Sequence, residues 1–145
     1  MAKVYASATI AAAPSAVWAV VRDFNALPKW TPFVAESRIE QNRLADQVGC
    51  IRNFRLKDGG RIREQLLALS DYEMSFGYAI LESPMGVENY YATFKLSPIT
   101  DLDHTFAEWQ AEFDAPPERQ DGLVAQIGRN VFAAGLAALR QRFSR

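Results

Sequence analysis

The sequence GCIRNFRLKDGGRIREQLLA (residues 49–68) decides the fold, because it holds two alternating segments around a turn. Successive side chains of a strand point to opposite faces, so apolar residues at every second position predict strands over 49–56 and 61–70. Asp58, Gly59 and Gly60 suit a tight turn, since Asp-Gly and Gly-Gly readily adopt positive φ angles. The stretch therefore predicts an antiparallel hairpin.

The same period of two recurs on both sides of this hairpin. It predicts five further strands, over residues 3–11, 34–41, 73–81, 88–96 and 104–113. Six of the seven predicted strands follow one another with short links. That order is typical of an antiparallel meander.

Three helices complete the predicted order. Pro14 suits the first turn of a helix, where its missing N–H is harmless, and a second short helix is expected over 25–30. After Pro116-Pro117 the sequence predicts one long helix from about residue 118 to 143. Regular helical spacing places an apolar arc on it, made of Val124, Ile127, Val131, Ala138 and Leu139.

Aromatic residues make up 12% of the chain, and many fall on the predicted inward faces. A curved sheet closed by one helix need not fill its interior, so these rings could form a well-packed core or line a small-molecule cavity. Buried Tyr and Trp need hydrogen-bond partners, which a cavity would supply. Gly128 and Gly135 on the helix leave the same two alternatives, close packing on the sheet or space for a ligand.

Arg52 and Glu64 are the notable charged residues on these apolar faces. The turn brings their strands together, so the two side chains should face each other or lie one step apart diagonally. A buried charge is costly unless it is paired, so we expect a mutual ion pair, a ligand contact or a place at a wet cavity mouth. A register slip of one residue would instead turn both side chains to solvent.

Composition narrows the classes of function. Sixteen Lys and Arg face seventeen Asp and Glu, and this balance argues against general binding of nucleic acid. Cys50 and His104 are each the only residue of their kind, so an intrachain disulfide and Cys/His zinc sites are ruled out. We predict no metal or cofactor. Pro14 interrupts the uncharged stretch 4–21, so we expect neither a signal peptide nor a transmembrane segment.

The order strand, two short helices, six strands and a long helix resembles the START-like (SRPBCC, helix-grip) superfamily, and in particular its bacterial proteins of the polyketide cyclase/dehydrase type. The resemblance is carried by residues 10–18 (IAAAPSAVW), Asp23-Phe24, Trp30, Gly49, Arg52, residues 63–67 with Asp71, Tyr78, Asn89-Tyr90, Trp109 and Phe113. It covers essentially the whole chain. It implies an α+β helix-grip fold, a seven-stranded curved antiparallel sheet wrapped around the C-terminal helix, in a single ligand-binding domain over residues 1–145.

The resemblance implies two main functions. The first is binding or transport of a hydrophobic small molecule, such as a lipid, an isoprenoid or a polyketide-like aromatic, between sheet and helix. The second is a cyclase or dehydratase. The residues best suited to such a reaction are Glu64 as acid or base, Tyr78 or Tyr90 as donor, and Arg52 as the group that stabilises an enolate. A macromolecular interaction module is a third alternative that no residue pattern here favours.

Ligand contacts are expected from the inward rings, the charged pair, the long helix and the region of the second short helix. The candidate residues are Trp30, Phe33, Arg52, Phe54, Glu64, Phe76, Tyr78, Tyr90, Phe94, Trp109, Phe113, Gly128, Val131 and Gly135. We further expect a monomer or weak homodimer. A lone cysteine and the absence of a signal peptide favour a cytoplasmic location.

Overall fold

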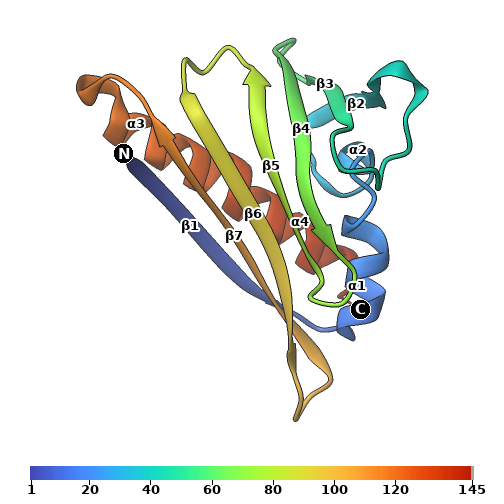
Figure 1. Ribbon diagram of the computed structural model, residues 1–145. Coiled ribbons are helices and arrows are strands. Elements are labelled where there is room, and N and C mark those ends of the chain that lie inside the picture. Colours follow the sequence, from blue (N-terminus) through green and yellow to red (C-terminus); the bar gives the residue numbers. More distant parts are fainter. Residues whose placement is uncertain (145) are drawn as a thin grey trace.

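A computed structural model describes residues 1–144 and shows a seven-stranded antiparallel sheet that curves around a long C-terminal helix (Figure 1). The strands are β1 (Ala2–Ile10), β2 (Val34–Ile39), β3 (Ile51–Leu56), β4 (Arg61–Ser70), β5 (Ser75–Glu82), β6 (Glu88–Ile99) and β7 (His104–Asp114). Their order in the sheet is β1-β7-β6-β5-β4-β3-β2. The predicted meander is therefore confirmed, with β1 joined to its far edge beside β7.

Helices cover the concave face of this sheet (Figure 1). They are α1 (Pro14–Val21), α2 (Leu27–Trp30) and the C-terminal helix, which consists of α3 (Pro117–Gln126), a π segment η2 (Ile127–Ala133) and α4 (Ala134–Arg142). A 3₁₀ turn (Glu40–Asn42) follows β2 and contacts β3. Of the two short helices, α2 contacts α4, and α1 packs against α2 (Figure 1). The helix-grip arrangement implied by the resemblance is thus present.

Side-chain hydrogen bonds fix α1 to the turn between β4 and β5. The Asp71 carboxylate accepts a bond from the indole Nε1 of Trp18 at 2.8 Å. It also accepts two bonds from Arg22, at 2.8 and 3.1 Å. Val17 and Val21 on the other side of the helix are buried, so α1 covers one end of the interior.

The C-terminal helix changes its winding at η2, and this moves its buried face. A π turn takes in one residue more than an α turn. The next fully buried residue after Ile127 is therefore Phe132, whereas regular spacing points to Val131, which is only half-buried. Leu136 follows Phe132 into the core. The arc predicted from regular spacing missed both residues because it assumed an unbroken α-helix.

The inner face of β4 also departs from the sequence prediction at one residue. Ile62, Glu64 and Leu66 point inward as predicted, but Ala68 is exposed. The pairing register with β5 shifts between Leu66 and Ala68, which inserts an extra residue and turns the following side chains over. The prediction that Ala68 lies inward is therefore wrong.

The helix Pro117–Arg142 has 26 residues and is long and apolar enough to cross a membrane by those criteria alone. Here its large apolar side chains pack into the core against the sheet. They are Leu123, Ile127, Phe132, Leu136 and Leu139. The helix is thus the core helix of this fold.

Candidate ligand cavity

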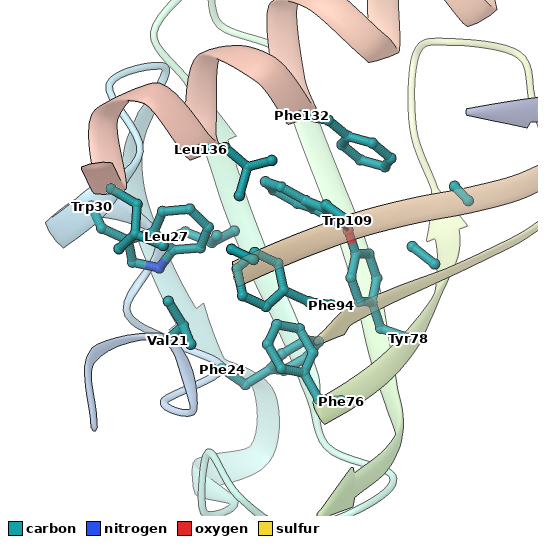
Figure 2. Packing of buried hydrophobic residues seen from close by; sticks show 14 of the residues in the cluster. Val21, Phe24, Leu27, Trp30, Phe76, Tyr78, Phe94, Trp109, Phe132 and Leu136 are labelled. Atoms are coloured by element: carbon teal, nitrogen blue, oxygen red, sulfur yellow. Dashed lines mark hydrogen bonds between the residues drawn. The ribbon is translucent and has the colours of Figure 1, made fainter. Parts of the chain in front are cut away.

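Aromatic rings fill the end of the interior that lies near α1 and α2 (Figure 2). The Phe94 ring centroid is 5.4 Å from those of Phe76 and Trp109, and 5.9 Å from that of Trp30. Phe132 of the C-terminal helix stacks on Trp109 at 4.5 Å. We call this set of rings the closed end, because side chains from the sheet, α2 and the C-terminal helix meet there.

A cavity of about 460 Å³ occupies the other end, between β3–β6 and the middle of the C-terminal helix. Its volume falls in the range of small-molecule sites, roughly 300–1,000 Å³. The apolar lining consists of Leu27, Phe33, Phe54, Leu56, Ile62, Ile80, Pro84, Met85, Ile127 and Val131. The polar and mixed lining consists of Arg52, Lys57, Asp58, Glu64, Tyr78, Tyr90, Trp109, Gln126 and Asn130. We call this region the open end.

Arg52 and Glu64 lie directly opposite each other in the β3–β4 register, as the hairpin predicted. The Arg52 Nε donates to Glu64 Oε1 at 2.8 Å, and Nη2 lies 2.6 Å from the same oxygen. Arg52 also donates to the carbonyl of Phe24 at 3.2 Å, and its guanidinium lies 3.9 Å from the Phe24 ring centroid. Of the alternatives left open by the sequence, the register slip is excluded. The two residues form a buried ion pair that also lines the cavity.

Burial raises the pKa of the Glu64 carboxyl above its ordinary value. The attraction and hydrogen bonds of Arg52 favour the carboxylate and offset part of that rise. A cavity-lining carboxyl with a raised pKa takes up a proton more readily than an exposed one, which is a property of a general acid or base.

Two tyrosines share the sheet wall of the cavity with this pair. The Tyr78 hydroxyl accepts a hydrogen bond from Trp109 Nε1 at 3.0 Å. Burial raises the pKa of Tyr78, and that of Tyr90 well above its ordinary value. Both hydroxyls therefore stay protonated at neutral pH and can donate hydrogen bonds inside the cavity.

The structure brings eight of the predicted ligand residues together around this cavity. They are Phe33, Arg52, Phe54, Glu64, Tyr78, Tyr90, Trp109 and Val131. The other six lie outside its lining: Trp30, Phe76, Phe94, Phe113, Gly128 and Gly135. Three of these six belong to the closed end, and Phe113 stacks on Tyr90 with ring centroids 5.9 Å apart.

The two helix glycines do not leave space for a ligand. A Cβ at Gly135 would lie 2.9 Å from Trp109 Cζ3, and one at Gly128 would lie 3.5 Å from Val4 Cγ1. Close packing of the helix on the sheet, the first of the two alternatives, therefore accounts for Gly135.

The sequence missed the residues at the mouth of the cavity. Two hairpin turns contribute Lys57 and Asp58 on one side and Pro84 and Met85 on the other. Arg119 ties the second turn to the C-terminal helix by donating to the carbonyl of Met85 at 2.8 Å. Turn residues carry no periodic signal, so nothing in their sequence marked them. By contrast, Leu56, Ile62 and Ile80 occupy inward strand positions that the period of two had indicated.

Comparison with known proteins agrees with this architecture. The family described as polyketide cyclase / dehydrase and lipid transport matches residues 1–144. The protein XoxI from Bacillus cereus is 30% identical, with a TM-score of 0.87 over 99% of this chain and 96% of that one.

Two more distant structures share the fold alone. A START superfamily protein from Mycobacterium smegmatis is 14% identical, with a TM-score of 0.79 over 99% of this chain and 97% of that one. The ZhuI aromatase/cyclase from Streptomyces sp. R1128 is 18% identical, with a TM-score of 0.80 over 97% of this chain and 92% of that one.

Proposed function

The chain belongs to the polyketide cyclase/dehydrase and lipid transport family, and from this premise we propose that it binds a hydrophobic small molecule in the cavity at the open end. The ligand belongs to one of three classes: a lipid, an isoprenoid or a polyketide-like aromatic. Family membership supports a role in hydrophobic ligand binding or in cyclisation. The choice between these two roles depends on the cavity itself.

The observation that carries the proposal is an apolar cavity with a small polar cluster on one wall. Ten of its nineteen lining side chains are apolar, while Arg52, Glu64 and the two tyrosines lie together on the strands. Small-molecule sites commonly combine a broad apolar surface with a few placed polar groups that orient the ligand. The proposed ligand therefore has a hydrophobic body and at least one polar group.

Native mass spectrometry of gently purified protein is the first test, since a retained ligand adds a defined mass. Titration with fatty alcohols, isoprenoid quinones and polycyclic phenols then measures the ligand-induced rise in melting temperature. Val131→Phe should abolish that rise because it fills the cavity from the helix. Val124→Phe is the matched control, since Val124 is half-buried on the same helix but does not line the cavity. A panel that raises the melting temperature of neither wild type nor control contradicts the proposal.

The second candidate function is a cyclase or dehydratase that uses Glu64 as acid or base. The raised pKa of this cavity-lining carboxyl specifically favours it. Tyr78 would act as a hydrogen-bond donor, and Arg52 would stabilise a developing enolate. The aromatase/cyclase with the same fold supplies the analogy. Glu64→Gln should retain ligand binding but lose turnover of an aromatic polyketide by about a hundredfold or more. Full turnover by this variant would exclude the assignment.

A further inference from the structure

The two carboxylate oxygens of Glu64 have different partners. Both contacts from Arg52 go to Oε1, at 2.8 Å from Nε and 2.6 Å from Nη2. Within residues 1–144 no hydrogen bond reaches Oε2. Every fully buried side-chain nitrogen and oxygen in that range does have a partner. Oε2 is therefore not sealed inside the protein, and it lies at the surface of the cavity that Glu64 lines.

The positive charge of Arg52 is already compensated at this wall. Its guanidinium bonds Glu64 and the carbonyl of Phe24, and the Phe24 ring covers one of its faces. At this wall, away from Lys57 at the mouth of the cavity, a ligand carboxylate or phosphate would lose its hydration without meeting an unpaired cation, and it would be repelled by Glu64. A ligand ammonium group would in turn be repelled by Arg52. The wall therefore disfavours charged ligands of either sign.

An uncharged hydrogen-bond donor is the group that this wall accepts best. We propose that the ligand is a neutral alcohol or phenol whose hydroxyl donates a hydrogen bond to Glu64 Oε2. The Tyr90 hydroxyl lines the same cavity and can donate to the ligand oxygen in return. This inference rests on the proposed function, because it assumes that the cavity binds a small molecule.

The apolar lining fits the remainder of such a ligand. Phe54, Ile62 and Ile80 extend from the polar wall along the strands, and Val131 faces them from the helix. A hydroxyl at one end of a hydrophobic body would reach Glu64 while the body replaces water along this surface. A ligand without a donor would leave Glu64 Oε2 buried and unpaired, which is costly, so the cavity should prefer ligands that carry a hydroxyl group.

Isothermal titration calorimetry at neutral pH tests the inference with two series of compounds. One series is naphthalen-2-ol, 2-methoxynaphthalene and naphthalene-2-carboxylate, and the other is 1-decanol, decyl methyl ether and decanoate. Each series keeps the apolar body and changes only the polar group. We expect the hydroxyl compound to bind about tenfold more tightly than its ether and its carboxylate in at least one series.

Two variants assign that preference to Glu64. In Glu64→Gln, the amide oxygen should take over the bonds from Arg52 and leave the NH₂ group facing the cavity. In the double variant Arg52→Met/Glu64→Leu, apolar side chains of similar volume replace the pair, a change that proteins commonly tolerate. The hydroxyl preference should fall to about twofold or less in both variants, while ether binding stays within about threefold. Glu112→Gln, an exposed carboxylate outside the cavity, is the control and should keep the preference.

The possible results separate the two proposals. Equal binding of all three groups, tighter binding of the carboxylates, or a hydroxyl preference that survives in both variants would each overturn this inference and leave small-molecule binding intact. Absence of binding by every compound to the wild-type protein would overturn the proposed function, and this inference with it. Circular dichroism and melting temperature establish whether each variant is folded. If the double variant does not fold, Glu64→Gln alone decides the test.

Discussion

The two ends of the interior use the same inward strand positions in different ways. At the closed end, Phe94 contacts rings from neighbouring strands and from α2, and Phe132 and Leu136 of the helix complete the packing (Figure 2). At the open end, the helix places Asn130 and Val131 opposite the strands and leaves a cavity of about 460 Å³. The difference arises largely on the helix, because the π turn directs its next large side chain to the closed end. An aromatic inward face alone therefore does not identify a ligand site.

The largest expected effect comes from truncating a ring at each end. Phe94→Ala should reduce the free energy of unfolding by about 4 kcal/mol, because Phe94 is fully buried among rings that cannot close the gap. Phe54→Ala should cost about 2 kcal/mol, since Phe54 already borders empty space. Urea unfolding measures both values. Equal losses would show that the open end is packed as tightly as the closed end.

The ion pair of the open end should behave differently from packed rings. Glu64→Leu should destabilise the fold by about 3 kcal/mol, because it leaves the buried Arg52 without its counter-charge. The double variant Arg52→Met/Glu64→Leu should recover most of that loss, whereas no second substitution of this kind would rescue Phe94→Ala. Urea unfolding of the single and double variants gives the coupling free energy between Arg52 and Glu64. A double variant as unstable as the single one would mean that packing, not charge, sets the cost.

The sequence predicted all seven strands and the facing of Arg52 and Glu64, because both follow from local rules. Alternation marks which face of a strand is apolar, and the turn at Asp58-Gly59 fixes the register of the hairpin. The errors came from features that add one residue. A bulge in β4 turned Ala68 outward, and a π turn placed Phe132 rather than Val131 in the core. Neither feature has a periodic signature.

The candidate site was predictable only in part, because a cavity is defined by what is missing opposite a side chain. Phe54 and Phe76 carry the same inward pattern, yet only Phe54 lines the cavity. Phe76 is instead covered by Phe24 and Phe94, with centroids 6.2 and 5.4 Å away. Such contacts join residues far apart in the chain, and no single stretch of sequence encodes them.

Acid should weaken the hydrogen bonds by which Glu40 links β3 and β4, two strands that line the cavity of the open end. Glu40 accepts hydrogen bonds from Arg63 at 2.7 and 2.9 Å and from Asn53 at 2.9 Å, and these bonds lower the pKa of its carboxyl from 4.5 to about 2. A lowered pKa stabilises the fold fully above pH 4.5, and the stabilisation is lost as the pH falls toward 2. Because Glu40 is partly exposed, we expect a contribution of about 1–2 kcal/mol.

The difference in unfolding free energy between wild type and Glu40→Gln isolates this contribution. It should be constant above pH 4.5 and shrink toward pH 2. The raised pKa of Glu64 acts in the opposite direction, but it is common to both proteins and cancels in the difference. A difference that does not change with pH would contradict the role of Glu40. Hydrogen exchange in acid should show β3 and β4 opening before β6 and β7.

The smallest effects compare two glycines on the same helix. Gly128→Ala should raise the unfolding free energy by about 0.5–1 kcal/mol, because the new methyl group meets Val4 Cγ1 at an ordinary 3.5 Å and alanine favours a helix. Gly135→Ala should lower it by about 1 kcal/mol, since a Cβ 2.9 Å from Trp109 Cζ3 must displace a ring held by Phe94 and Phe132. Stabilisation by both substitutions would show that the rings of the closed end can move to accept a methyl group. The closed end would then not be packed more tightly than the open end. Opposite signs would mean that the position of each glycine along the helix, rather than helix propensity, decides how closely the helix approaches the sheet.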